Sequence, residues 1–145
     1  MGYLKVYIHF VWTTKNHVHY LQNDIRQKVF DHIRENAKAK GIHIDCVNGY
    51  TDHVHCLISM DPTHSIAQIM NLIKGESSFW INKNKLTAQK FEWQDDYWGE
   101  SINKDDDLER VRKYIYNQEE HHRKVTYAEE YAAFIASAEL CEKSG

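Results

Sequence analysis

The sequence predicts an α+β domain in which strands and helices follow the order β-α-β-β-α-β, with additional C-terminal helices. Three observations support this prediction: an alternating apolar segment at the start, apolar residues spaced by four after it, and two alternating segments joined by a short turn. The order is typical of the ferredoxin-like or RRM-like arrangement, an antiparallel sheet with two helices on one face.

The N-terminal half contains the expected first strand, first helix and hairpin. Residues 3–13 alternate between apolar and polar side chains, which indicates a half-buried strand. A helix is expected at about 22–40, because its apolar stripe ends just before Gly41. Strands expected at 42–50 and 52–60 are joined by a glycine-containing turn, which favours a hairpin.

The C-terminal half supplies a second helix, a short strand and further helices. Ser65 and Gln68 form a capping box at the start of the second helix. A short strand is expected near 97–103, and a run of three aspartates caps a helix expected at 106–121. A last helix is expected at 127–140.

Length and composition indicate one soluble domain, residues 1–145. The chain is long enough for a single core, and one proline with six glycines leaves no room for a disordered linker. No stretch is long enough to span a membrane, and the N-terminal segment fails as a signal peptide. Three cysteines without Cys-x-x-Cys spacing predict reduced thiols in a cytoplasmic protein.

The net charge of −3 argues mildly against a nucleic-acid-binding protein, because phosphate contacts need Lys and Arg. The charge is unevenly distributed, however. Residues 74–90 hold four lysines and one glutamate, whereas residues 91–109 hold eight acids and one lysine. The acids can therefore mask a locally basic surface, although two solvated faces of opposite charge explain the pattern equally well.

A histidine pair lies in the second strand of the hairpin. His53 and His55 share one face because residues two apart on a strand point the same way, roughly 6.5–7 Å apart. Val54, Cys56 and Ile58 form the opposite, apolar face. Two such imidazoles can bind one divalent ion with a third ligand from elsewhere. The alternative is a pair of solvent-facing histidines, since roughly 0.7 His-x-His matches are expected by chance.

Two other histidine pairs lack this context. His17 and His19 follow the end of a strand without apolar alternation, which indicates a loop rather than a site. His121 and His122 are neighbours on a helix and diverge by about 100°, so a shared ion is not expected.

A tyrosine and an amide lie one turn apart on the helix expected at 106–121. Tyr114 and Gln118 are spaced i, i+4 and therefore share one side, which borders an apolar stripe. Tyr116 lies about 200° around the helix and cannot share that site. The pattern alone leaves open whether Tyr114 is a nucleophile or a packing residue.

Together these motifs resemble the single-tyrosine HUH transposases of the insertion-sequence-200 type. The matching segments occur in the family's order and cover nearly the whole chain, with Asp96-Tyr97 departing from the more usual Gly-Tyr. The segments are His53-Val54-His55, Ile73-Lys74-Gly75-Glu76-Ser77-Ser78, Trp93-Gln94, Tyr114-Ile115-Tyr116-Asn117-Gln118, His121-His122 and Glu129-Glu130-Tyr131.

The resemblance implies a metal-dependent DNA transposase, an endonuclease and ligase of single-stranded DNA at insertion-sequence ends. His53, His55 and Gln118 would hold Mg²⁺ or Mn²⁺, and Tyr114 would form a covalent 5′-phosphotyrosine intermediate. It also implies single-stranded DNA hairpins as partners and a homodimer whose active sites are shared between subunits. The candidate phosphate contacts are Lys15, Lys74, Lys83, Lys85, Arg112 and Lys113.

Three alternatives remain at the level of sequence. A non-catalytic module could bind single-stranded nucleic acid by stacking on an exposed sheet face carrying Tyr7 and His9. A domesticated, repeat-associated tyrosine transposase would share every motif above. A zinc hydrolase would need more ligands near His55, and residues 56–60 hold no further His or Asp.

Overall fold

The computed structural model describes residues 4–122 and 126–144 and contains one four-stranded sheet. The strands are antiparallel in the order β2-β3-β1-β4, which confirms the predicted α+β ferredoxin-like arrangement. The elements are β1 (Tyr7–Thr13), η1 (Lys15–His17, a 3₁₀ turn), α1 (Asn23–Ala39), β2 (His43–Gly49), β3 (His53–Ser59), α2 (Ile66–Lys83), β4 (Trp98–Ile102), α3 (Asp105–Tyr116), α4 (Gln118–His122) and α5 (Tyr127–Ser144).

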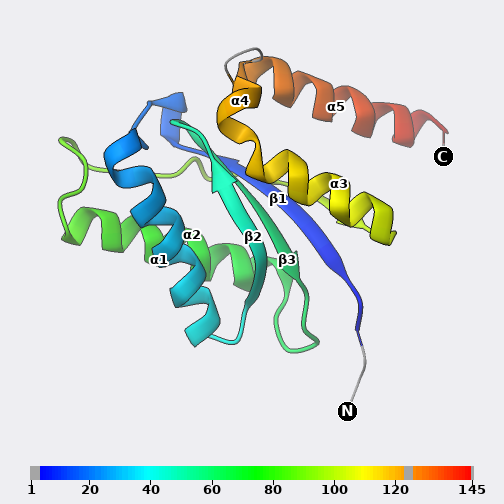
Figure 1. Cartoon of the computed structure of the whole chain (residues 1–145), viewed down its shortest axis with the longest axis horizontal. Helices are drawn as coiled ribbons and strands as arrows, with labels where there is room; N and C mark the ends of the chain where they lie inside the picture. Colours follow the sequence, from blue (N-terminus) through cyan, green and yellow to red (C-terminus); the bar gives the residue numbers. More distant parts are fainter. Residues whose placement is uncertain (1–3, 123–125, 145) are drawn as a thin grey trace.

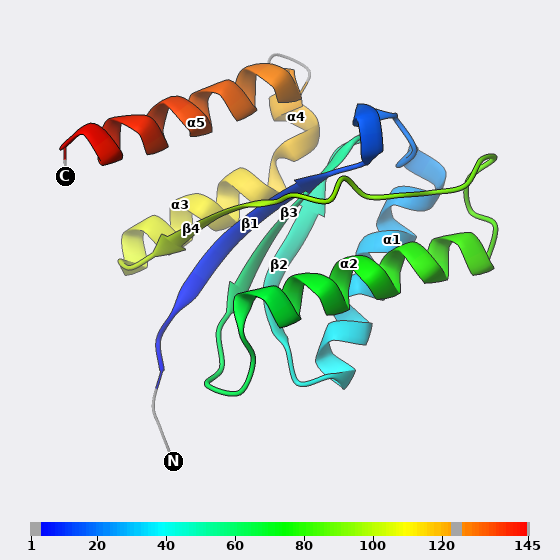
Figure 2. The ribbon, with the colours of Figure 1, turned by 180° about the vertical axis from the view of Figure 1, so that it is seen from behind.

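Helices cover both faces of the sheet. Figure 1 shows α1 and α2 on one side of the strands and α3, α4 and α5 on the other, and Figure 2 shows the same layers from behind. The chain therefore folds as three layers, with the sheet in the middle.

The face under α1 and α2 holds the larger apolar core. Val54, Cys56 and Ile58 of β3 point into it, as their alternation predicts. The capping box between Ser65 and Gln68 at the start of α2 is also confirmed. Other members of this core are Phe10, Trp12, Leu21, Val29, Phe30, Ile33, Ala37, Ile42, Ile44, Val47, Ile69, Met70, Ile73, Ile81, Phe91 and Trp93.

The face under α3, α4 and α5 is buried as well, so the expectation of a half-buried first strand was wrong. A smaller apolar cluster joins Leu57 of β3 to Leu108 and Ile115 of α3. On β1, His9 is only 4% exposed. The helices after β4 fold back over this face, and alternation within one strand carries no information about such a cover.

One expected helix is interrupted. Instead of running over 106–121, α3 ends at Tyr116 and α4 begins at Gln118. The side-chain amide of Asn48 donates to the carbonyl oxygens of Ile115 (2.9 Å) and Tyr116 (3.2 Å), satisfying groups at the end of α3. Asp105, Asp106 and Asp107 lie in the first turn of α3 rather than at its N-cap. Their negative charges stabilise the helix by interacting with the positive end of its dipole.

Two further sequence expectations concern cysteines and membranes. Cys46 and Cys56 are free, buried thiols, and the side chain of Cys141 lies outside the part of the chain that the structure describes. Among residues 4–122 and 126–144, the structure contains no helix long and apolar enough to cross a membrane.

Candidate active site and metal centre

His53 and His55 lie on the face of β3 that α3, α4 and α5 cover. Both side chains are fully buried, with 0% relative exposure, so the alternative of two solvent-facing histidines was wrong. Because they are two residues apart on one strand, their ring centroids lie 5.1 Å from each other. Burying two imidazoles is unfavourable unless their nitrogens have partners, so the contacts of these rings indicate what the site can bind.

Each ring is oriented by a hydrogen bond at Nδ1. The Nδ1 atom of His53 lies 2.8 Å from Oδ1 of Asp52, and Nδ1 of His55 lies 2.9 Å from Nε2 of His9. Histidines that ligate metals are commonly held in this way by a partner at the second ring nitrogen. The two Nε2 atoms are consequently left facing the interior of the site.

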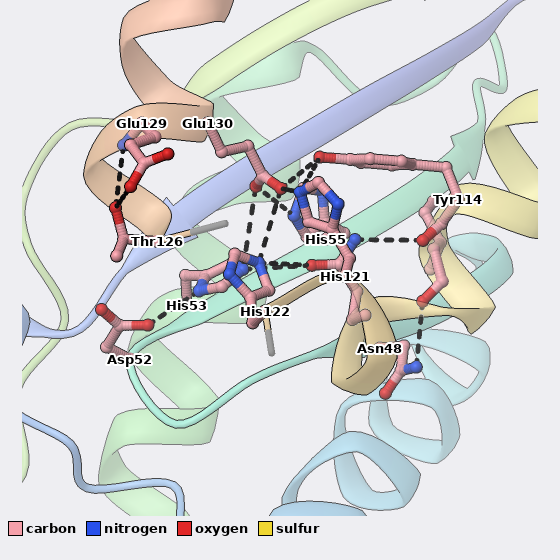
Figure 3. Close-up of polar contacts among 12 residues, drawn as sticks. Asn48, Asp52, His53, His55, Tyr114, His121, His122, Thr126, Glu129 and Glu130 are labelled. Carbon is pink, nitrogen blue, oxygen red and sulfur yellow. Dashed lines mark hydrogen bonds and ion pairs between the residues drawn. The ribbon is translucent and has the colours of Figure 1, made fainter. Parts of the chain in front are cut away.

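Glu130 of α5 brings a carboxylate to these nitrogens (Figure 3). Its side chain is 2% exposed, and its Oε1 atom lies 2.8 Å from Nε2 of His55 and 3.8 Å from Nε2 of His53. Its Oε2 atom lies 2.6 Å from Nε2 of His121 and 3.4 Å from Nε2 of His122. One carboxylate thus joins β3, α4 and α5.

Four side chains form a candidate metal-binding group: His53, His55, His122 and Glu130. Each offers one ligand atom, and these atoms all lie within 4.8 Å of one another. Imidazole nitrogens with a carboxylate oxygen are suitable ligands for divalent transition metals. The residues present therefore fit a bound cation.

Gln118 supplies a second reason to expect a cation. Its Oε1 atom lies 3.2 Å from Nε2 of His53. The same oxygen lies 3.0 Å from Nε2 of His122, so it faces two imidazoles of the metal-binding group. Side-chain amide oxygens are ligands for divalent ions, and this oxygen could bind a cation together with the imidazole nitrogens. Gln118 is fully buried, as a ligand here requires.

The hydroxyl of Tyr114 reaches the same site. It donates a short hydrogen bond to Oε2 of Glu130 and lies 3.4 Å from Nε2 of His121. The side-chain amide of Gln118 donates to the backbone carbonyl of Tyr114 at 3.0 Å, so the two residues stay together across the helix break. Tyr116 is 61% exposed and lies outside the site, as its position on the helix predicts.

Burial shifts the pKa values of several groups in the site and so determines their charge. Burial lowers the pKa of His9 to about 3 and that of His55 to about 4, so both rings are neutral at neutral pH. Burial alone would raise the pKa of Glu130, but hydrogen bonds from His122 and His55 hold it far below its usual range. Burial and then the Glu130 carboxylate raise the pKa of Tyr114 well above its usual value. An ionised carboxylate therefore faces a protonated phenol.

Sequence reasoning missed several residues of this group. His122 and Glu130 belong to the tail segments that carried the resemblance, but neither was assigned a ligand role. His121 and His122 diverge around the helix, yet both rings contact the same carboxylate of Glu130. Residues 56–60 supply no further metal ligand. The additional candidate ligands, His122 and Glu130, come from α4 and α5.

The six predicted phosphate contacts do not gather at the site. Lys74 donates to three backbone carbonyls, and Arg112 pairs with Asp45 at 2.8 Å and with Glu109 at 2.5 Å, so both are engaged within the protein. Lys15 pairs with Glu92 at 3.3 Å. Their role in DNA binding stays a prediction, as does that of the exposed Lys83, Lys85 and Lys113.

Two further expectations are decided by the placement of side chains. His17 and His19 lie in η1 and the loop after it, and neither belongs to the metal-binding group found among the described residues. The stacking face proposed for a non-catalytic binding module is covered, because His9 is buried under the C-terminal helices.

Comparison with known proteins identifies the family. The model of the IS200-like transposases matches residues 3–118, and the chain belongs to this family. The match ends at Gln118, so Glu130 lies beyond it. No functionally curated protein matches the chain.

Two solved structures share the fold. A crystal structure of a candidate transposase from Deinococcus radiodurans R1 has a TM-score of 0.64 and 22% identity, covering 81% of this chain and 95% of that chain. A REP-associated tyrosine transposase bound to a REP hairpin has a TM-score of 0.64 and 18% identity, covering 86% of this chain and 73% of that chain. Both likenesses concern the fold.

Proposed function

We propose that the protein is a DNA transposase that cleaves and rejoins single-stranded DNA at insertion-sequence ends through a 5′-phosphotyrosine on Tyr114. One observation carries this proposal: the hydroxyl of Tyr114 and Nε2 of His55 bind the two oxygens of the same Glu130 carboxylate. The candidate nucleophile and the candidate metal ligands therefore share one buried site. Membership in the IS200-like transposase family supports the same reaction.

The chain's own groups account for the chemical step. The phenolic oxygen of Tyr114 attacks phosphorus and the P–O3′ bond breaks, which leaves a 5′-phosphotyrosine and a 3′-oxygen that takes a proton from solvent. The phenolic proton passes to Oε2 of Glu130, which already accepts it. Attack by another 3′-hydroxyl reverses these steps and joins a new strand.

His53, His55 and Gln118, with Glu130 and His122 beside them, would hold a divalent ion. When bound, such an ion would polarise the phosphoryl oxygen and neutralise developing charge. Mg²⁺ or Mn²⁺ stays the predicted cofactor, and the imidazole-rich ligand set favours Mn²⁺ of the two.

The proposed partner is a single-stranded DNA hairpin at each element end. The REP hairpin bound by a structural neighbour is consistent with this partner. We also propose that one chain supplies a complete site, because Tyr114 lies beside the histidine pair of its own chain. A homodimer, a cytoplasmic location and the choice between a mobile and a domesticated transposase stay predictions. Active sites shared between the subunits of that homodimer, as the resemblance implies, are the alternative to a complete site in one chain.

A denaturing-gel assay tests the reaction. Single-stranded oligonucleotides covering the DNA beside the gene are incubated with protein and Mg²⁺ or Mn²⁺, and a covalent adduct is expected that EDTA prevents. Tyr114→Phe is expected to abolish the adduct, whereas Tyr116→Phe, on the exposed side of the same helix, retains it. An adduct that persists in Tyr114→Phe would overturn the assignment of the nucleophile.

A further inference from the structure

A pocket of about 480 Å³ lies beside the candidate active site, where the ends of β1 and the start of β4 meet the first turns of α5. Five of its lining residues are tyrosines or tryptophans: Trp12, Tyr97, Trp98, Tyr127 and Tyr131. Tyr97 and Tyr131 are 42% and 41% exposed, so the pocket has aromatic rings at its rim. We propose that this pocket binds one unpaired base of the DNA strand that enters the site, an inference that rests on the proposed function.

The pocket and the metal-binding group share a wall. The ring of Tyr127 is 7% exposed and lies 4.5 Å from the ring of His53, centroid to centroid. Glu130 follows Tyr127 by one helical turn on the same side of α5 and reaches His55. A base in the pocket would therefore be separated by the Tyr127 ring from the metal-binding group, whose Glu130 also accepts the hydroxyl of Tyr114.

The chemistry of the lining fits a base rather than a phosphate. Among its described lining residues there is no lysine or arginine, and Asp96 adds a negative charge that would repel phosphate. Asn16 and Gln94 bring amide groups to the same lining. Aromatic faces stack on any base, while amides and a carboxylate can bond the edge of one.

The walls are fixed before any ligand binds. The ammonium group of Lys74 donates to the carbonyl oxygens of Gln94 (2.6 Å), Asp95 (2.9 Å) and Asp96 (3.1 Å), which ties down the segment before β4. Across the pocket, Asn16 and its neighbour His17 both have φ of 57°, a backbone conformation that non-glycine residues seldom adopt. Backbone strain of this kind is concentrated at functional sites, and rigid walls reduce the entropy lost on binding.

The test measures binding of a fluorescent dT12 single strand to the full-length protein in Mg²⁺ buffer, by fluorescence anisotropy. Tyr131→Ala is expected to weaken binding roughly 5- to 100-fold, the usual effect of removing one stacking ring. Tyr131→Phe keeps the ring and is expected to bind as the wild type does. Tyr116→Ala, an exposed tyrosine outside the pocket, is the matched control and is expected to leave affinity unchanged. A dodecamer of abasic nucleotides is expected to bind as weakly as dT12 binds the Tyr131→Ala variant.

Three outcomes would each overturn the pocket while leaving the transposase proposal standing. Tyr131→Ala could bind dT12 as tightly as the wild type does, or it could lose no more affinity than Tyr116→Ala. The abasic strand could also bind as tightly as dT12. A wild-type protein that binds no single strand at all would overturn both the pocket and the transposase proposal. Photo-crosslinking with 5-iodouracil in dT12 locates the contact directly. A cross-linked peptide containing residues 96–98 or 127–131 supports the pocket, and cross-links confined to other peptides contradict it.

Discussion

The face of the sheet under α1 and α2 and the face under α3, α4 and α5 are both buried, but their chemistry differs. On the first face β3 contributes Val54, Cys56 and Ile58 to an apolar core. On the second it contributes His53 and His55, which contact a buried carboxylate. Apolar burial stabilises a fold directly, whereas buried polar groups are at best neutral unless fully satisfied. We infer that the first face holds the fold together and the second is retained for chemistry.

The largest expected effect tests the first face. Phe30→Ala removes a side chain that is 1% exposed, so the free energy of unfolding should fall by about 3–5 kcal/mol. Urea denaturation measures this loss. Phe79→Ala, where the side chain is 65% exposed, is the matched control and should change stability by less than about 0.5 kcal/mol. Similar losses in both variants would erase the distinction.

Acid should destabilise the protein through the second face. Burial lowers the pKa of His9 to about 3 and that of His55 to about 4, whereas a histidine in the unfolded chain has its ordinary pKa of 6.5. The unfolded chain therefore binds protons more readily as the pH falls below 6.5. The lowered pKa of Glu130 acts in the same direction below its ordinary value of 4.5. Stability is therefore complete above pH 6.5 and should fall by a few kcal/mol on acidification to about pH 4.5.

Urea unfolding at several pH values measures this slope. His9→Phe should flatten it, whereas His43→Gln, at an exposed histidine, should not. A stability that rises on acidification would contradict the placement of neutral rings in the site.

Binding of a cation should stabilise the second face alone. In the wild type, Mn²⁺ at about 100 times its dissociation constant should add about 2.7 kcal/mol to the free energy of unfolding. His53→Ala should remove this gain, and EDTA should reverse it. His19→Ala, from the other His-x-His segment, should retain it. Thermal denaturation with and without the ion measures this gain in stability. If His53→Ala retained the gain, the ion would have to bind elsewhere.

The smallest expected effect concerns the C-terminal end of α3, the helix that carries Tyr114. Asn48→Ala removes the amide that donates to the carbonyls of Ile115 and Tyr116, which should cost about 1 kcal/mol of stability. Asn84→Ala, at the end of α2 on the opposite layer, should cost a similar amount but leave adduct formation unchanged. An unaltered adduct yield in Asn48→Ala would show that this hydrogen bond does not position Tyr114.

The sequence predicted the first face well and the second only in part. Alternation along β3 is a local property, so it correctly assigned Val54 to the core and placed His53 on the other side. What covers that other side depends on α5, whose Glu130 lies 75 residues from His55 along the chain. The resemblance marked Glu130 within a matching segment, but no local rule distinguishes it from the other acids.

The break between α3 and α4 was beyond sequence reasoning for the same reason. Helical periodicity continues through residues 114–118, and the break coincides with hydrogen bonds from Asn48 on a distant strand. Tyr114 and Gln118 remain neighbours across the helix break, because the side-chain amide of Gln118 donates a hydrogen bond to the backbone carbonyl of Tyr114. Spacing predicted the partners, and tertiary contacts determined their geometry.

A mixing experiment tests most directly whether one chain contains the complete site. Tyr114→Phe lacks the proposed nucleophile and His55→Asn lacks a proposed metal ligand, so neither should form an adduct alone. Circular dichroism establishes that each variant is folded. If the site belongs to a single chain, the mixture should remain inactive. Adduct formation restored in the mixture would contradict that account and show that the tyrosine of one subunit serves the histidines of another.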